Sequence, residues 1–297
     1  MSEQFHKDIH KDSFKLRILT TNACNLNCSY CLNDFQPKPK TEDDKLFIDP
    51  EFAMMVIEAY RLYCRNNNIF PEFYYSGGES TIHPAYLDLV DIVAKLECEK
   101  KFVLCTNGLK FQQSDILHSL GKFTELHISL HRSSTFQDQI EQIARLLPLL
   151  DSSSILQQVV FDAVLVDNLG CKFGLTGGEI DQAWNRIQDN LFPGDTKFKV
   201  WCDYWKTSDP SYMEYYRWFI NEHPWILNRG KDFTPTNRGA FCEGCKKNCV
   251  TLKAIWAFPD NTIYPCPQSD PKERWQASTV TELYSLMEEA YQGHKVS

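Results

Sequence analysis

Three cysteines that fall within eight residues, Cys24, Cys28 and Cys31, constrain this chain more than any other feature of its sequence. They follow an apolar run at 16–19 that predicts a strand, and so short a spacing lets thiolates hold one metal centre without help from distant parts of the fold. Their loop contains no fourth cysteine or histidine. A structural zinc site takes four protein ligands, whereas a four-iron cluster held by three leaves one iron open to another molecule. The alternatives are an iron–sulfur cluster and three buried or zinc-binding cysteines.

The composition limits the class of protein and its compartment. A chain of 297 residues, 43% hydrophobic and 24% charged, can form one large α/β barrel or two average globular domains. A net charge of −8 argues against a protein that grips nucleic-acid phosphates, and no apolar stretch approaches the ~20 residues of a membrane span. The N-terminus lacks the apolar core of a signal peptide, so the 12 cysteines indicate thiols and metal ligands in a reducing compartment. We predict a cytoplasmic protein with neither nucleic-acid nor membrane partners.

A second motif follows the next predicted strand, at 73–75, and consists of Ser76, Gly77, Gly78 and Glu79. The pattern S-x-x-E is also that of a helix capping box, but residues 80–84 make a poor first helical turn. Glycines that end a strand without starting a helix are expected where backbone must approach a ligand closely. The tetrad is therefore a candidate binding site.

A second Gly-Gly-Glu, at 177–179, serves as a comparison. Thr176 precedes it, and an amphipathic helical pattern with Ile180, Ala183 and Ile187 follows. A capping box explains this tetrad well, so we assign it no cofactor role.

Strands and helices alternate along the first two thirds of the chain. Strands are predicted at about 15–20, 73–75, 101–105, 125–131, 159–166 and 197–202. The first helix is predicted to begin at Asp49-Pro50, an N-cap followed by proline in the first helical position, and to end at 66–68. About six strand–helix units predict an α/β fold in which helical crossovers join parallel strands.

The strand at 125–131 alternates strictly, with Leu126, Ile128 and Leu130 on one face. His127, Ser129 and His131 share the other face, which we expect to look inward at the site; the alternative is an exposed antiparallel strand. Thr106 and Asn107, in the predicted turn after the third strand, are further candidates for cofactor contact.

Four more cysteines lie near the C-terminus: Cys242, Cys245, Cys249 and Cys266. Their number suits either a structural zinc or a second cluster. A hairpin is predicted over 255–264 and delivers Cys266.

The order of these motifs resembles that of the radical S-adenosylmethionine (SAM) superfamily: a strand, the CxxxCxxC loop, a helix, a second strand and Gly-Gly-Glu. The resemblance implies a partial (β/α)6, TIM-like barrel and a [4Fe-4S] cluster whose free iron chelates SAM. It assigns the cluster to Cys24, Cys28 and Cys31. Tyr30 is the usual aromatic residue before the third cysteine. The residues expected to contact SAM are Tyr30, Ser76, Gly77, Gly78, Glu79, Thr106, Asn107 and Ser129. Relatives often carry an acid where this sequence has His131.

The C-terminal third resembles the SPASM and twitch extensions that carry auxiliary clusters. Asn261 stands where their turn glycine usually lies, and no cysteine follows Cys266, so a full two-cluster SPASM domain is excluded. The expected organisation is a tail at 1–13, the partial barrel at 14–205, and a small cysteine-containing α+β cap at 206–297. We expect one auxiliary [4Fe-4S] cluster in the cap, with zinc as the alternative.

The resemblance implies an enzyme that cleaves SAM reductively to a 5′-deoxyadenosyl radical, which abstracts hydrogen from a substrate. An external electron donor such as flavodoxin or ferredoxin would supply the electron. Peptide modification is slightly favoured; oxidation or rearrangement of a small polar metabolite is the alternative, and a non-catalytic metal-bound scaffold or partner-binding protein a remote one. His131, Arg132 and Asp203 are candidate catalytic residues by position alone.

Overall fold

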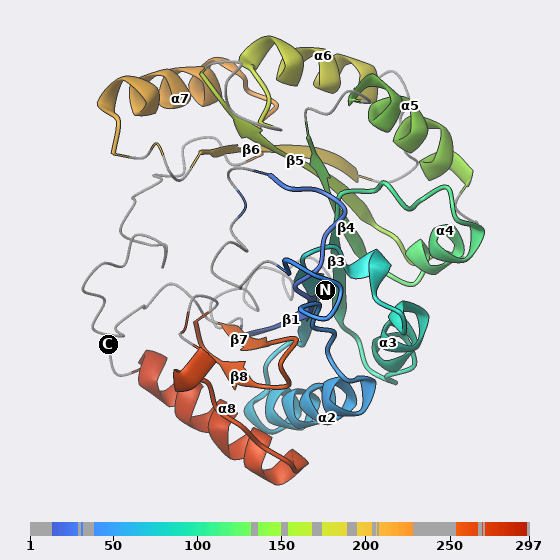
Figure 1. The fold of residues 1–297 in the computed structure, drawn as a ribbon, viewed down its shortest axis with the longest axis vertical. Coiled ribbons are helices and arrows are strands. Elements are labelled where there is room, and N and C mark those ends of the chain that lie inside the picture. The colour runs from blue at the N-terminus through green and yellow to red at the C-terminus, as the bar shows by residue number, and fades with distance from the viewer. Residues whose placement is uncertain are drawn as a thin grey trace, which may run out of the picture. The chain divides into compact units, whose positions relative to one another are not determined.

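The structure, a computed structural model, describes residues 14–28, 31, 39–131, 136–149, 154–167, 174–188, 195–203, 206, 208–227, 254–266, 269 and 271–295. They belong to two compact units (Figure 1). The first is drawn from Met1–Cys24, Asn33–Leu104 and Thr236–Ser297, and the second from Asn25–Leu32 and Cys105–Pro235. No helix within the described ranges is long and apolar enough to cross a membrane.

The predicted alternation of strands and helices is confirmed, and each predicted strand lies close to its expected ends. The strands β1 to β8 cover Lys15–Thr21, Glu72–Gly77, Lys101–Thr106, Glu125–Leu130, Gln158–Leu165, Asp195–Cys202, Ala254–Ala257 and Ile263–Tyr264. The helices are α2 (Pro50–Asn67), α3 (Tyr86–Ala94), α4 (Ser114–Leu120), α5 (Phe136–Leu146), α6 (Gly177–Gln188), α7 (Pro210–Glu222) and α8 (Val280–Lys295).

In the first unit the strands lie in the order β3-β2-β1-β7-β8 (Figure 1). β1 is central and pairs in parallel with both neighbours, so that Lys15 lies opposite Glu72 on one side and Ala254 on the other. β8 returns antiparallel to β7, which confirms the predicted hairpin. The hairpin near the C-terminus therefore extends the sheet that begins at residue 15.

Helices cover one face of this sheet. Phe14 packs its ring against Tyr60 and Tyr63 of α2 and Tyr291 of α8, at centroid distances of 6.1, 5.6 and 5.4 Å. The Tyr60 hydroxyl donates to the Phe14 carbonyl and accepts the backbone N–H of Glu72, so α2 is tied to both β1 and β2. Because side chains alternate along a strand, Arg17 lies on the opposite face of β1 from the buried Leu16 and Ile18.

The ends of α2 are those predicted. The Asp49 carboxylate accepts the N–H of Glu51 at 2.8 Å, and Asn68 ends the helix in the left-handed region at φ 55°. Asn261 has φ 58°, and its side-chain oxygen accepts the N–H of Asp49 at 2.9 Å. Asparagine thus replaces the turn glycine because it tolerates this backbone conformation and also binds the start of α2.

In the second unit, β4, β5 and β6 lie side by side in parallel. Leu126, Ile128 and Leu130 of β4 are buried, with exposures of 0%, 0% and 1%, whereas His127 and Ser129 are half-buried. The predicted alternation along β4, in a parallel rather than an antiparallel sheet, is confirmed.

Candidate functional site

The cysteine loop begins where β1 ends, and the segment at 44–48 anchors its first residues. Thr21 Oγ1 donates to the carbonyl of Leu46 at 2.8 Å, and Asn22 Oδ1 accepts the N–H of Leu46 at 2.8 Å. Asn22 Nδ2 also donates to the carbonyl of Asp44 at 3.2 Å. Cys24, which follows this anchored stretch in the first unit, is exposed and so accessible to a metal centre.

The Gly-Gly-Glu tetrad lies directly against this loop. The N–H of Gly78 donates to the Thr21 carbonyl at 2.7 Å, and the N–H of Glu79 to the Ala23 carbonyl at 2.8 Å. A Cβ on Gly78 would lie 1.9 Å from the Ala23 oxygen, and Gly77 has φ +123°. The glycines are therefore required by the approach of the cysteine loop's own backbone, whereas the sequence had indicated the approach of a ligand.

Glu79 also differs from expectation, because a helical turn does follow the glycines. Its carboxylate is buried and accepts the N–H and hydroxyl of Thr81 at 3.2 and 2.6 Å, which caps a 3₁₀ helix, η3 (Ser80–Ile82). Ser76, the first residue of the tetrad, accepts Ser80 Oγ at its carbonyl, at 3.1 Å. The expectation of no helix after Gly78 was wrong, since glutamate rather than serine acts as the cap.

In the second unit, Cys28 lies beside the end of β4. Its side chain is buried, and Sγ is 3.6 Å from Nδ1 of His131. The N–H of Cys31, which is half-buried, donates to the carbonyl of Cys28 at 3.3 Å and so closes a turn between these two cysteines. Burial lowers the pKa of His131 to about 4, so its imidazole is neutral near pH 7.

Asn107 and Gln139 brace the same region of the second unit. Asn107 Nδ2 donates to Oδ1 of Asn25 in the cysteine loop at 2.6 Å. Gln139 of α5 donates to the carbonyls of Asn107 and Ser129 at 2.7 and 3.1 Å, and accepts the N–H of His131 at 3.4 Å. Gln139 was not predicted from the sequence, because a polar residue within a helical pattern gives no sign that it is buried.

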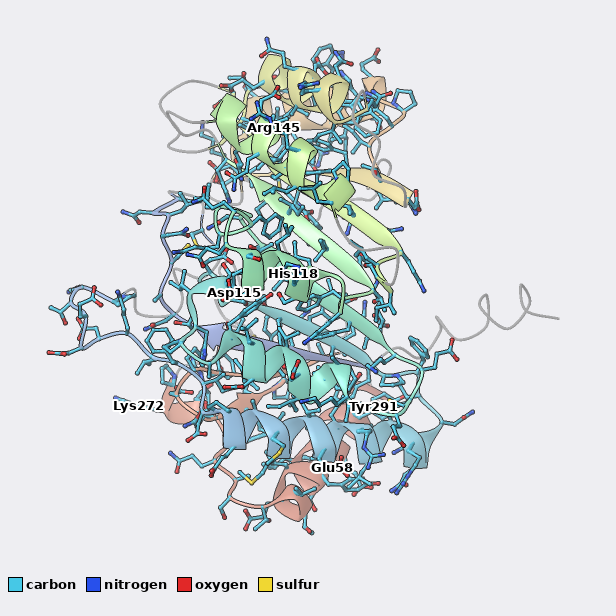
Figure 2. All side chains as sticks on the ribbon, turned by 90° about the vertical axis from the view of Figure 1, so that its right-hand side faces the viewer. Glu58, Asp115, His118, Arg145, Lys272 and Tyr291 are labelled. Atoms are coloured by element: carbon cyan, nitrogen blue, oxygen red, sulfur yellow. The ribbon has the colours of Figure 1, made fainter. Side chains whose placement is uncertain are left out.

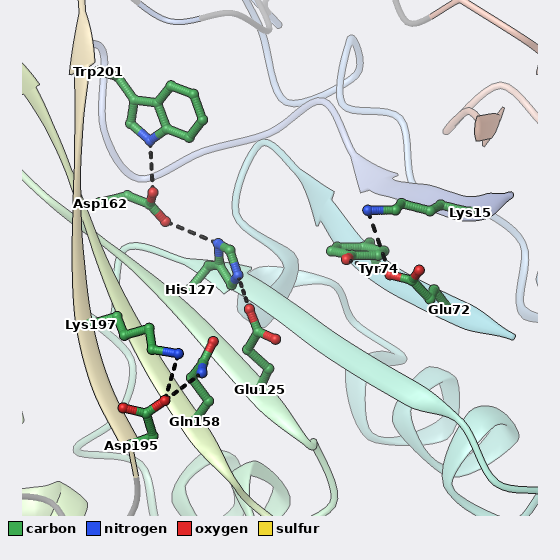
Figure 3. A network of polar contacts seen from close by, with 10 residues as sticks. All are labelled: Lys15, Glu72, Tyr74, Glu125, His127, Gln158, Asp162, Asp195, Lys197 and Trp201. Atoms are coloured by element: carbon green, nitrogen blue, oxygen red, sulfur yellow. Dashed lines mark hydrogen bonds and ion pairs between the residues drawn. The ribbon is translucent and has the colours of Figure 1, made fainter. Parts of the chain in front are cut away.

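A charged network lies on the polar face of β4 and β5 (Figure 3). His127 contacts Glu125 through Nε2 at 2.5 Å and Asp162 through Nδ1 at 3.1 Å, and Trp201 Nε1 donates to Asp162 at 2.7 Å. Burial lowers the pKa of His127, but the hydrogen bonds to Asp162 and Glu125 outweigh it, so the pKa lies above its usual 6.5. The two carboxylates therefore favour the protonated form of the imidazole.

Arg17 forms a second polar feature, on the face of the first unit's sheet opposite the one that α2 and α8 cover. Its guanidinium lies 4.5 Å from the ring centroid of Tyr74 and 5.2 Å from that of Trp256. In the described part of the chain no carboxylate forms an ion pair with Arg17, and Trp256 Nε1 is buried without a hydrogen-bond partner. Sequence analysis missed this group, although the alternation of β1 could have placed Arg17 opposite the core face.

The remaining predicted site residues are distributed as follows. Thr106 Oγ1 accepts the N–H of Gly108 at 3.0 Å, which confirms the turn after β3. Asp203 is buried, and its N–H donates to the Tyr212 hydroxyl. Cys266 is half-buried after the hairpin. Outside the described residues lie Tyr30, Arg132, Cys242, Cys245 and Cys249.

The second Gly-Gly-Glu behaves as predicted for a capping box. Glu179 of α6 accepts both the N–H and the hydroxyl of Thr176 at 2.8 Å. An added Cβ on Gly178 would meet nothing within 4 Å. The two tetrads thus share a sequence but differ in what their backbones touch.

Residues 18–147, which include the cysteine loop, the Gly77–Glu79 turn and β4, match the model of the Radical SAM superfamily. This stretch is similar to radical SAM domains. The GTP 3′,8-cyclase of Mannheimia succiniciproducens is 29% identical over 109 residues, which cover 35% of this chain and 28% of the cyclase. That of Vibrio parahaemolyticus is 27% identical over 130 residues, 44% of this chain and 37% of the cyclase. The chain thus spans about a third of the length of these curated relatives.

Two solved structures share the fold. Streptococcus suis SuiB bound to S-adenosylmethionine matches with a TM-score of 0.58 at 13% identity, over 95% of this chain and 68% of SuiB. Native anSMEcpe with bound AdoMet matches with a TM-score of 0.56 at 15% identity, over 95% of this chain and 82% of that one. The predicted α/β class, with parallel strands in a partial barrel, is confirmed; the cysteine-containing cap stays a prediction.

The contact at Gly78 generates a paired prediction. Gly78→Ala should lower the iron content of the reconstituted protein and weaken SAM binding, because the new Cβ displaces the Ala23 carbonyl beside Cys24. Gly178→Ala is the matched control and should change neither, while leaving stability equal or raising it by up to about 1 kcal/mol. Iron analysis and equilibrium binding of SAM test the pair, and equal losses in both variants would contradict the assignment.

His127 generates a pH prediction. Because its folded pKa is raised, its contribution to the free energy of unfolding is fully present below the unfolded pKa of 6.5 and is lost as pH rises through the folded value. The difference in unfolding free energy between wild type and His127→Gln should therefore shrink from pH 6 to pH 9. Urea titrations across that range measure it, and a difference that is constant with pH contradicts the charged network.

Proposed function

We propose that this chain is a radical SAM enzyme in which Cys24, Cys28 and Cys31 hold a [4Fe-4S] cluster that binds SAM. The observation that carries the proposal is the direct backbone contact between Gly78-Glu79 and the cysteine loop at Thr21 and Ala23. It brings the tetrad that the resemblance assigns to SAM against the loop that would hold the iron. The domain match at 18–147 supports the same conclusion.

The donor set fits the proposed cluster. Thiolates are the ligands that iron–sulfur clusters take from proteins. Cys24 is exposed, and the N–H of Cys31 donates to the carbonyl of Cys28. Among the described residues, no three side chains of His, Cys, Asp or Glu are gathered to hold a metal ion. Assembly of the three thiols around one centre is therefore part of the proposal.

The cluster and SAM, when bound, supply reductive cleavage of SAM and abstraction of a hydrogen atom from substrate, with an electron from a donor such as flavodoxin or ferredoxin. The chain's own part is to hold and orient these groups. Asn107 and Gln139 fix the cysteine loop and the end of β4. The buried Glu79 carboxylate fixes the turn after Gly78.

Two substrate classes enter the proposal. A peptide is supported by the fold likeness to SuiB bound to precursor peptide SuiA, with a TM-score of 0.56, and to anSMEcpe with Cp18Cys peptide, with a TM-score of 0.53. A small polar metabolite is supported by the cyclase relatives, whose name specifies GTP.

The chain's own residues favour an anionic group on the substrate, and hence the metabolite. A guanidinium between two aromatic rings is fixed in plane and keeps its N–H edges available. The buried Nε1 of Trp256 beside Arg17 is a second donor without an acceptor. A carboxylate or phosphate on the substrate would pair with the N–H edge of the Arg17 guanidinium.

The C-terminal cysteines complete the proposal. We assign a second cluster to Cys242, Cys245, Cys249 and Cys266, with a structural zinc as the alternative. Four thiolates satisfy the ligand count of either group.

The first test counts iron and follows SAM. Anaerobically reconstituted protein should bind about eight irons, and the Cys24/Cys28/Cys31→Ala triple variant about four. The reduced wild type should convert SAM to 5′-deoxyadenosine and methionine, measured by chromatography, while the triple variant should not. If wild type holds about four irons and one tightly bound zinc, the second site is a zinc site, and only the proposal of a second cluster is contradicted. If the iron-loaded wild-type protein neither binds SAM nor produces 5′-deoxyadenosine, the scaffold alternative is supported.

The second test addresses substrate class with two simple anions, pyrophosphate and glutarate. Each is titrated into wild type, Arg17→Leu and Arg186→Leu by calorimetry; Arg186 is the control because it pairs with Glu141 in the second unit. Binding of one anion should fall at least about tenfold in Arg17→Leu and stay unchanged in Arg186→Leu, since a buried charge-assisted hydrogen bond contributes about 1.5–3 kcal/mol. Anion binding that is equal in all three proteins removes the argument for the metabolite.

A further inference from the structure

The contact between Cys28 and His131 joins a proposed cluster ligand to a residue that the site has not yet used. Nδ1 of His131 lies 3.6 Å from Cys28 Sγ, within reach of an N–H···S hydrogen bond. His131 follows the last residue of β4, on the face it shares with Ser129. The two partners are distant in sequence and belong to the same unit.

Both partners are held in place by the same part of the second unit. Cys28 is 8% exposed, and its loop is tied through Asn25 to Asn107. Gln139 donates to the Asn107 carbonyl and accepts the N–H of His131. One buried glutamine therefore holds the main chain at His131 relative to the loop that carries the sulfur.

A hydrogen bond to a cluster sulfur changes the reduction potential of the cluster. The reduced cluster carries more negative charge on its sulfurs than the oxidised one, so an N–H donor stabilises the reduced form more and raises the reduction potential. A carboxylate at the same position would act in the opposite direction, because it brings negative charge and no N–H.

We propose that His131 is a positioning residue that donates Nδ1–H to the Cys28 sulfur and raises the reduction potential of the cluster held by Cys24, Cys28 and Cys31. This inference rests on the proposed function. It gives His131 a role other than that of the catalytic candidate that its place in the sequence suggested. Its consequence is an easier transfer of the first electron to the cluster.

The test is an EPR-monitored redox titration of reconstituted full-length variants, following the signal that the Cys24/Cys28/Cys31→Ala variant lacks. His131→Leu should shift its midpoint potential to more negative values. His131→Asn should restore most of the wild-type value, since the asparagine Nδ2–H occupies nearly the place of the imidazole Nδ1–H. The control is His118→Leu, which removes a histidine bound to Ser114 on α4 (Figure 2) and should leave the potential unchanged.

Equal potentials in wild type and His131→Leu would overturn the inference, as would equal shifts in the leucine and asparagine variants. If His131→Leu loses its iron, His131→Asn is compared with His131→Asp, which has the same shape but no N–H, and the aspartate variant should have the lower potential. If wild type does not form the cluster at all, the proposed function is refuted. That result differs from a wild type that forms the cluster but has the same potential as His131→Leu, which refutes only the hydrogen bond.

Discussion

The first unit depends on one contact between two stretches of backbone. Gly78 lies so close to the Ala23 carbonyl that a Cβ would come within 1.9 Å of its oxygen, and no rotamer change can relieve a clash between main-chain atoms. In return the turn gives two N–H donors to the carbonyls of Thr21 and Ala23. The parallel pairing of β1 and β2 is thus prolonged beyond the ends of the strands, which fixes the loop bearing Cys24 against the tetrad.

A second constraint is how charges are accommodated on the polar faces of the strands. A charge removed from water costs several kcal/mol unless it is compensated nearby. The two units use different compensation: Arg17 lies between the rings of Tyr74 and Trp256, and His127 between two carboxylates. The first arrangement leaves hydrogen-bond donors available, whereas the second uses both imidazole nitrogens. We therefore place ligand recognition at Arg17 and a structural role at His127.

The sequence predicted correctly those features that depend on residues close together in the chain, such as helix starts and capping boxes. Asp49-Pro50 marked the start of α2, and Thr176 with Glu179 formed the expected capping box, because each is decided within a few residues. The structural reason for Gly78 was not predictable, since it depends on a loop more than fifty residues earlier in the chain. Trp256 was likewise beyond prediction: its place beside Arg17 follows from the register of β7 on β1, which the sequence of neither strand reveals.

The histidine at 131 shows how one exchange can alter a site without changing its fold. Main-chain bonds hold the end of β4, since Gln139 contacts the carbonyl of Ser129 and the N–H of His131. The main chain at this position is thus held by bonds that do not involve the side chain of residue 131. At the proposed cluster, an acid there would place negative charge beside the Cys28 sulfur and oppose the arrival of an electron. An imidazole that donates Nδ1–H would favour that arrival, so the proposal implies that this chain accepts its electron from a weaker reductant than it would with an acid at position 131.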